Sequence, residues 1–204
     1  ITNRLIEYKE KWGSNSILYY AASGMSGLLN NVSSDFWKLY GGVTTVYGNL
    51  CWPAGLEATR LTLGENKHNI PEDLENAKLI VLWGKNPAES NIHQMVFIEN
   101  AQRKDAKLIV IDPRRTPSSE RADLLLQPIP GTDAILALAV AKIIISQNQH
   151  DREFVEKHVH GFGEFEQSLV HINIDLASKK CGIPVHLIKH LAELIGTTKP
   201  MTLI

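Results

Sequence analysis

Three polar loops, each marked by Gly or Pro, carry residue types that could bind a nucleotide. They are Gly84-Lys85-Asn86-Pro87, Asp112-Pro113-Arg114-Arg115-Thr116 and Pro130-Gly131-Thr132-Asp133. A carboxylate such as Asp112, at the end of the second strand of a βαβ unit, is where dinucleotide-binding folds contact ribose hydroxyls. Adjacent arginines can bind a pyrophosphate in forked geometry. Three such loops after successive strands predict a nucleotide site.

Each loop also has a simpler interpretation. Gly84 would let the backbone approach a ligand, and free amides at the start of the next helix favour a phosphate. Asn86, Pro87 and Glu89 equally form a capping pattern that needs no ligand. Asp133 either complements the dipole of the following helix or accepts two hydrogen bonds from a base edge such as that of guanine. The two arginines could simply be solvated charges in a turn.

The elements that must position these loops form a βαβ pattern. Lys78–Trp83 and Lys107–Ile111 are continuous apolar runs of strand length, and Ala88–Arg103 between them has helical character. Such runs are typical of a buried parallel sheet. Asp123–Gln127 is predicted as a third strand and Thr132–Gln147 as an apolar helix. The predicted class is therefore α/β, a doubly wound and mainly parallel sheet with flanking helices, whose ligands bind beyond the carboxyl ends of the strands.

The remaining elements are predicted from hydrophobic periodicity and from residues such as Gly that mark helix ends. Gly196 is predicted to end the last helix, and a strand is predicted to start at Met201. The chain begins inside a helical pattern without an initiator Met, so we expect a piece of a longer protein. The other predicted helices are Ile1–Lys11, Asp35–Tyr40, Gly55–Leu63, Asp151–His158, Glu164–His171 and Pro184–Ile195, with a strand at Ser16–Ala22.

The composition excludes several classes of protein. The 204 residues carry a net charge of −1, with 44% hydrophobic and 21% charged residues. A core is therefore expected, and duplex nucleic acid is not an expected partner. Two cysteines, Cys51 and Cys181, form neither a disulfide framework nor a zinc spacing. The longest apolar run, Ala134–Ser146, is interrupted by Lys142 and is too short to span a bilayer. The absence of a GxGxxG motif argues against an ordinary NAD-binding domain.

Taken in order, these motifs resemble the molybdopterin oxidoreductase family, the group similar to dimethyl sulfoxide reductase. The resemblance covers nearly the whole chain. It implies a molybdenum or tungsten atom held by two pyranopterin guanine dinucleotides, one of them bound in this chain. The strings that carry the resemblance are Trp83–Ser90, Ile111–Thr116, Ala122-Asp123 and Pro130–Ala134. The cofactor-binding residues that it implies are Ser23, Gly24, Gly84, Asn86, Pro87, Asp112, Arg114, Thr116, Gly131 and Asp133.

The resemblance also implies roles for these residues. Gly84–Asn86 would lie near the pterin and phosphates, Asp112 and Arg114 would contact the ribose and pyrophosphate, and Gly131–Asp133 the guanine end. Ser23-Gly24 would approach the metal from a neighbouring domain, a looser match.

Cys51 matches the position from which the family supplies its protein ligand to the metal. A thiolate is a soft, anionic ligand suited to a thiol-rich metal site. The alternative is a buried structural cysteine, which is also how Cys181 is interpreted. Formate dehydrogenases have His directly after the metal ligand, whereas this sequence has Trp52, which weakens a formate assignment and leaves the substrate open.

The resemblance further implies a domain division and partners. Residues 1–50 would belong to a neighbouring α/β lobe, and residues 51–204 to a guanine-dinucleotide-binding domain that is incomplete at its C-terminus. A 4Fe-4S cluster, an electron-transfer domain or subunit and a small-molecule substrate are expected for the parent, with no nucleic acid and no membrane span in this chain. The fragment alone is expected to be inactive. The expected compartment is cytoplasmic, with a periplasmic parent as the alternative.

Two other functions fit the same residues. A non-catalytic scaffold, like a large subunit of respiratory complex I, keeps this fold without the molybdenum cofactor, although Cys51, Asp112 and Asp133 argue against it. A plain nucleotide-binding module using NAD or GDP is the third alternative.

Overall fold

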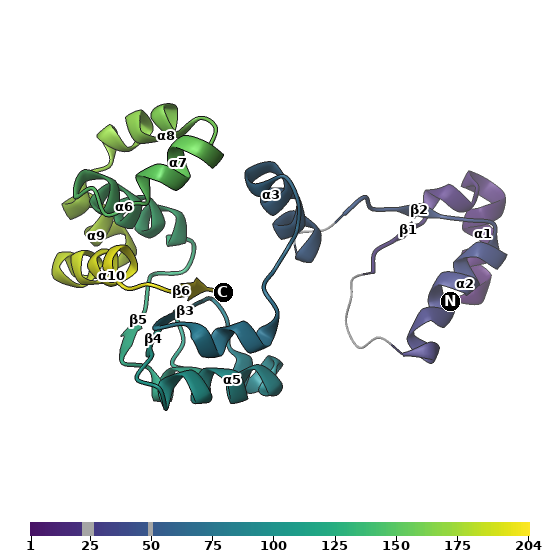
Figure 1. Cartoon of the computed structure of the whole chain (residues 1–204). Coiled ribbons are helices and arrows are strands. Elements are labelled where there is room, and N and C mark those ends of the chain that lie inside the picture. Colours follow the sequence, from purple (N-terminus) through teal and green to yellow (C-terminus); the bar gives the residue numbers. More distant parts are fainter. Residues whose placement is uncertain (22–26, 49–50) are drawn as a thin grey trace. The chain divides into compact units, whose positions relative to one another are not determined.

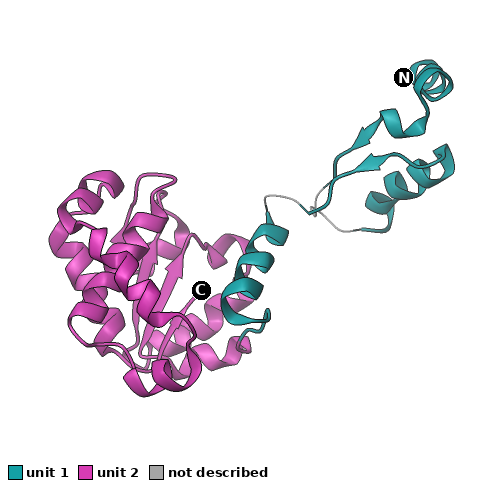
Figure 2. Cartoon of the chain, turned by 90° about the horizontal axis from the view of Figure 1, so that it is seen from above, with its two compact units in different colours: residues 1–68 teal, residues 69–204 magenta. Residues whose placement is uncertain are grey.

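The structure is a computed structural model of the chain, and it describes residues 1–21, 27–48 and 51–204 (Figure 1). The chain divides into two compact units, Ile1–His68 and Asn69–Ile204 (Figure 2). Among the described residues, no helix combines the length and apolar character needed to cross a membrane.

A four-stranded sheet forms the centre of the second unit. All strands are parallel, in the order β5-β4-β3-β6. The apolar runs form strands because both faces of the sheet are covered, so that Leu79–Leu82 and Leu108–Ile111 are fully buried. The predicted βαβ unit, third strand and C-terminal strand are confirmed, as is the α/β class. The strands are β3 (Leu79–Trp83), β4 (Lys107–Ile111), β5 (Leu124–Leu126) and β6 (Met201–Leu203).

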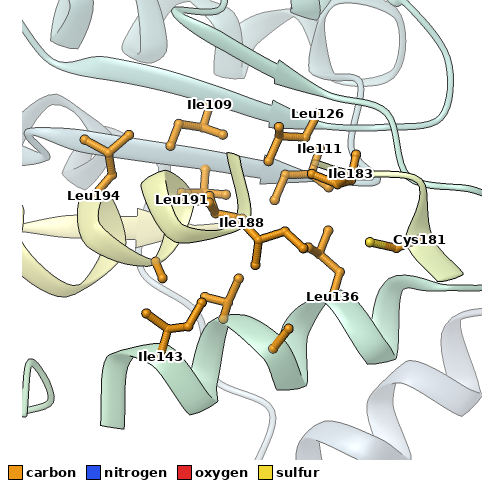
Figure 3. Close-up of a cluster of buried hydrophobic side chains, with 14 of the residues drawn as sticks. Ile109, Ile111, Leu126, Leu136, Ile143, Cys181, Ile183, Ile188, Leu191 and Leu194 are labelled. Atoms are coloured by element: carbon orange, nitrogen blue, oxygen red, sulfur yellow. The ribbon is translucent and has the colours of Figure 1, made fainter. Parts of the chain in front are cut away.

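Alternate side chains of the strands enter two separate cores, one on each face of the sheet. Ile80, Leu82, Leu108 and Val110 face one core, which also contains Leu74 of η3 (Pro71–Asn76) and buried residues of α5 (Ile92–Gln102). Leu79, Val81, Ile109 and Ile111 face the other. There they pack with α6 (Asp133–Ser146), α9 (Ile174–Cys181) and α10 (Val185–Thr197), and Figure 3 shows the side chains of α6 and α10 meeting those of β4. Helices on both faces make the fold doubly wound.

Two helical predictions for this unit are corrected, and one further helix was not predicted. The predicted helix Ala88–Arg103 is two helices, α4 (Pro87–Ser90) and α5, separated by Asn91 with an extended backbone (φ −155°, ψ 67°). Helix α9 was not predicted, because its buried residues are only Ala177 and Cys181. Gly196 does not end α10, which continues to Thr197.

The reason for Gly196 is a close approach. A Cβ at this position would lie 2.8 Å from Cβ of Gln149, so a glycine is needed inside the helix rather than at its end. Between β5 and α10 the unit also contains three short helical segments that overlap the predicted helices Asp151–His158 and Glu164–His171. They are α7 (Arg152–His158), α8 (Phe162–Ser168) and η5 (Leu169–His171), while η4 (Pro117–Arg121) joins β4 to β5.

The first unit is built from short elements. Its sheet consists of two residue pairs, Leu18 with Thr44 and Tyr19 with Thr45. The predicted strand Ser16–Ala22 is therefore confirmed at Leu18–Tyr19, and its last residue, Ala22, lies outside the described residues. Its α-helices contain no buried residue among those described. The elements are α1 (Thr2–Trp12), η1 (Ser14–Ser16), β1 (Leu18–Tyr19), η2 (Leu28–Asn31), α2 (Val32–Tyr40), β2 (Thr44–Thr45) and α3 (Trp52–Leu63).

The division between the compact units falls after His68, whereas the sequence places the lobe boundary at residue 50. Helix α3, which follows Cys51, therefore groups with the first unit. The assignment of residues 1–50 to a separate lobe of a larger enzyme stays a prediction.

Candidate functional site

The three polar loops lie at one edge of the sheet, because the strands that precede them are parallel and end at the same side. Two hydrogen bonds join the loops to their neighbours. The Gly84 N–H donates to the Ile111 carbonyl at 2.8 Å, and Nε2 of Gln127 donates to the Pro113 carbonyl at 3.0 Å. The strand order reverses between β3 and β6, which is the switch point at which doubly wound sheets bind ligands.

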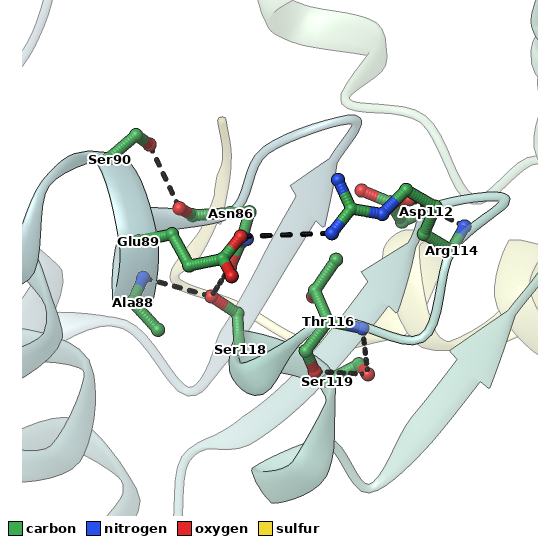
Figure 4. Close-up of polar contacts among 9 residues, drawn as sticks. All are labelled: Asn86, Ala88, Glu89, Ser90, Asp112, Arg114, Thr116, Ser118 and Ser119. Atoms are coloured by element: carbon green, nitrogen blue, oxygen red, sulfur yellow. Dashed lines mark hydrogen bonds and ion pairs between the residues drawn. The ribbon is translucent and has the colours of Figure 1, made fainter.

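The first loop is fixed to η4 by a network around Asn86 (Figure 4). The Ser118 hydroxyl donates to Oδ1 of Asn86 at 2.7 Å and accepts from the Ala88 N–H at 3.0 Å. The Asn86 side-chain amide donates to the Glu89 carboxylate. The expected Asn86 cap is therefore wrong in detail: Ser118, from a different segment, satisfies the helix N–H, and Asn86 binds Ser118 and Glu89 instead.

The second loop combines a buried carboxylate with an exposed guanidinium. Asp112 is 9% exposed, and its Oδ1 accepts from the Arg114 N–H at 2.7 Å, which shapes the turn after β4. Nη2 of Arg114 lies 3.8 Å from Oε2 of Glu89, and both side chains are exposed. An exposed pair at this distance is weak. Arg114 can therefore exchange Glu89 for another anion at little cost.

Thr116 starts η4 in a capping-box arrangement with Ser119. The Thr116 N–H donates to Oγ of Ser119 at 3.0 Å, and that hydroxyl donates back to the Thr116 carbonyl at 2.7 Å. The Thr116 hydroxyl is buried; the Ser119 N–H approaches it as the capping box requires, and no described residue accepts a hydrogen bond from it. Its O–H can therefore donate to a ligand that enters this edge.

The third loop meets the first through a side-chain hydrogen bond. Nε1 of Trp83, the last residue of β3, donates to Oδ1 of Asp133 at 2.8 Å. Thr132 does not cap α6 with its side chain; its hydroxyl donates to the Ile129 carbonyl at 2.6 Å. Asp133 is exposed in the first turn of α6, where its charge complements the helix dipole.

Two glycines give the backbone of these loops room for a ligand. Gly84 and Gly131 have positive φ values of 64° and 82°, a conformation that favours glycine. A Cβ added to either would meet no atom within 4 Å, so open space lies beside both. This room, the buried Asp112, the Thr116 hydroxyl and the Arg114 guanidinium match the needs of a phosphate and a ribose. The residues present fit a nucleotide-bearing cofactor.

The other predicted site residues belong to the first unit. Cys51 is exposed and occupies the N-cap position of α3. Ser23 and Gly24 lie outside the described residues. Within the part of the chain that the structure describes, no three His, Cys, Asp or Glu side chains gather as a metal site. One thiolate from the protein would thus need further ligands from a bound cofactor.

Sequence reasoning missed the parts that Ser118 and Trp83 play. Ser118 follows Thr116-Pro117, a helix-start pattern, but nothing in that pattern indicates a bond to Asn86, which lies 32 positions away. Trp83 was noted only as a member of a motif. Its role could have been predicted from its position, because an aromatic residue with a hydrogen-bond donor at the end of a buried strand usually has a partner for that donor.

Comparison with known proteins supports this description. The family model of molybdopterin oxidoreductases matches residues 1–204. The chain is 36% identical to the F420-dependent formate dehydrogenase subunit alpha of Methanocaldococcus jannaschii, over 67% of this chain and 20% of that protein. It is 30% identical to the dimethyl sulfoxide reductase DmsA of Escherichia coli, over 94% of this chain and 28% of that protein.

A solved structure agrees with the sequence comparisons. Acetylene hydratase from Pelobacter acetylenicus matches with a TM-score of 0.72 and 27% identity, over 98% of this chain and 28% of that one. The chain spans 20–30% of the length of the curated relatives it matches. From the motifs, the sheet and these matches together, the chain belongs to the molybdopterin oxidoreductase family.

Proposed function

We propose that this chain holds one pterin guanine dinucleotide in the catalytic subunit of a molybdopterin-dependent oxidoreductase, and that Cys51 supplies the protein ligand to molybdenum or tungsten. One observation carries the dinucleotide part. Three polar loops end at one edge of a parallel sheet, with open space beside Gly84 and Gly131. The family match supports a molybdopterin cofactor rather than NAD.

Each loop has a part in binding. The backbone at Gly84 and Pro87 lies beside the phosphates and pterin, since the open space at Gly84 lets a ligand approach the backbone closely. Asp112 accepts hydrogen bonds from ribose hydroxyls, while the Arg114 N–H holds the Asp112 carboxylate in place. The Arg114 guanidinium leaves Glu89 and binds the pyrophosphate. Asp133 accepts from the guanine edge. When bound, the metal-bearing cofactor supplies a centre that accepts or donates two electrons or an oxygen atom.

The protein residues orient this cofactor and do not themselves take part in electron transfer. Asn86, Glu89 and Ser118 hold the first loop in one conformation before the cofactor arrives. The exposed Cys51 at the start of α3 offers a soft sulfur ligand. The second dinucleotide, a 4Fe-4S cluster and an electron-transfer domain or subunit lie outside these 204 residues in the proposed enzyme; a relative named as a subunit alpha supports such an assembly.

The substrate is chosen elsewhere in the proposed enzyme. Proteins named formate dehydrogenase, dimethyl sulfoxide reductase and acetylene hydratase all match this segment. A segment common to three differently named activities fits a role in holding the cofactor better than a role in recognising the substrate.

Calorimetric titration of the chain with GDP and with NAD tests the nucleotide site. We expect binding of GDP and none of NAD. In Asp133→Asn the amide N–H can donate to the extra carbonyl of xanthine, so the variant should prefer XDP to GDP. Asp175→Asn, an exposed aspartate in the first turn of α9, is the matched control and should keep the preference for GDP. NAD binding equal to that of GDP would contradict the proposal and favour a plain nucleotide-binding module.

The metal ligand is tested in a full-length subunit that contains this chain. Cys51→Ser should remove one sulfur neighbour from the metal in X-ray absorption spectra, whereas Cys181→Ser should not, because Cys181 is buried in the second core. An unchanged sulfur count in Cys51→Ser would exclude Cys51 as a ligand. A purified subunit that contains neither molybdenum nor tungsten would favour the scaffold.

A further inference from the structure

Trp83 joins three elements at the switch point of the sheet. Its backbone N–H donates to the Ile204 carbonyl at 2.8 Å, next to β6, and its indole N–H donates to Oδ1 of Asp133 at the start of α6. The rest of its ring is partly buried against the core that contains α6 and α10. The ring is therefore held by packing, and its polar edge is aimed at one carboxylate.

We propose that Trp83 is a positioning residue that orients Asp133 to select guanine over other bases. This inference rests on the proposed function, in which Asp133 meets the base. Recognition of guanine by a carboxylate needs both oxygens directed at two adjacent donors, the ring N–H and the exocyclic amino group. An exposed aspartate samples several rotamers, and the indole bond restricts it to one of them.

The chemistry of the indole suits this role. The indole N–H is a donor only, so it can donate a hydrogen bond to the carboxylate but cannot accept one from it. It is uncharged, and unlike Arg or Lys it leaves the negative charge of Asp133 available to the base. Each carboxylate oxygen has two lone pairs, and no described residue donates to Oδ2. Oδ2 and the second lone pair of Oδ1 therefore stay available for the base.

Trp83→Phe tests this assignment, since it keeps an aromatic ring in the core and removes only the donor. The full chain is titrated with GDP and with IDP, which lacks the exocyclic amino group. Wild type should prefer GDP by about tenfold, the size expected for one additional hydrogen bond to a charged carboxylate. In Trp83→Phe we expect that preference to fall by about threefold or more. Trp12→Phe, an exposed tryptophan of the first unit, is the control and should leave it unchanged.

A double-mutant cycle separates positioning from a general weakening of the loop. If Trp83 acts through Asp133, Trp83→Phe should have no further effect on base preference in the Asp133→Asn background. Additive effects, or an unchanged GDP-to-IDP ratio in Trp83→Phe, would overturn the inference. Failure of wild type to bind GDP would instead overturn the proposed function.

Should Trp83→Phe not fold, the wild-type indole N–H resonance of Trp83 provides the readout by ¹⁵N NMR. GDP should shift this resonance more than IDP does. Equal shifts with the two nucleotides would count against the inference.

Discussion

The two units of the chain bury very different amounts of apolar surface. In the second unit the residues Leu79–Leu82 and Leu108–Ile111 of the two central strands are 0% exposed. In the first unit Leu39, which lies on α2, is 89% exposed, and no described residue of α1, α2 or α3 is buried. Burial of apolar area is the main favourable term in folding, so the second unit has its own source of stability and the first has little.

This difference parallels the chemistry proposed for the two units. The loops proposed to bind the dinucleotide lie on the unit with two cores, where strand ends hold them at fixed spacing. Cys51 lies in the unit whose described residues form no buried core. A preformed nucleotide site needs rigid support, whereas a single metal ligand can acquire its position when the metal and the surrounding protein are present.

Separate expression of residues 69–204 and residues 1–68 is the strongest test of the difference in stability between the two units. We expect the longer piece to unfold cooperatively in urea and the shorter one to show no cooperative transition by circular dichroism, because, among the residues that the structure describes, buried apolar clusters occur in the longer piece alone. A sharp transition in residues 1–68 would refute the contrast.

Matched leucine substitutions should give the next largest effect. Leu108→Ala should lower the free energy of unfolding by about 2–5 kcal/mol, because it leaves a cavity between the sheet and α5. Leu39→Ala should change it by less than about 0.5 kcal/mol, as usual for an exposed site. Urea denaturation of the two variants measures both values, and similar losses would show that α2 is buried in solution.

An arginine pair sharpens the assignment of the nucleotide site to the second unit. Arg114 and Arg103 both lie 3.8 Å from a glutamate and are 71% and 72% exposed. Arg114→Gln should raise the Kd for GDP by about tenfold, the value of one charge-assisted hydrogen bond at an exposed site. It should also weaken the salt dependence of binding. Arg103→Gln should change neither, and equal effects in calorimetry would argue for non-specific attraction.

The smallest expected effect concerns acid stability at the junction of η3 and α5. Hydrogen bonds from Asn100 and then from Lys104 lower the pKa of Glu75 below its usual 4.5. A carboxylate with a lowered folded pKa adds stability above pH 4.5, and that stability is lost as the pH falls through the folded pKa. Glu75→Gln should therefore lower Tm slightly at pH 7, and this deficit should shrink as the pH falls below 4.5; a deficit that stays constant would contradict the pairing. Glu72→Gln in the same turn serves as the control.

The sequence predicted the sheet well, because its strands are short and mostly apolar. Lys107–Ile111 was predicted at the observed bounds, and β3 differs from its prediction by one residue. A run of Ile, Leu and Val between polar loops has few other ways to be buried. The meeting of three loops at one edge followed from the parallel pairing alone.

What escaped prediction depends on contacts between distant segments. Asn86 looked like a helix cap, yet Ser118 takes over part of that role from a segment that folds against it. Gly196 looked like a helix end, yet it makes room for Gln149. Local patterns reflect the preferences of neighbouring residues. The roles of Asn86 and Gly196 depend instead on side chains that pack against them from distant segments. Cys51 and the dinucleotide residues stay predictions about a cofactor.

The strand order has a consequence for how the chain assembles. Leu79 pairs with Lys107 on one side and with Met201 on the other. As a nascent chain emerges N-terminal end first, β3, β4 and β5 can pair early, while β3 stays an exposed edge strand until the last helices and β6 have been made. The late, long-range pairing of β6 forms the hydrogen bond between Trp83 and Ile204. Competence to bind a nucleotide at the switch point should therefore be among the last properties that the folding chain acquires.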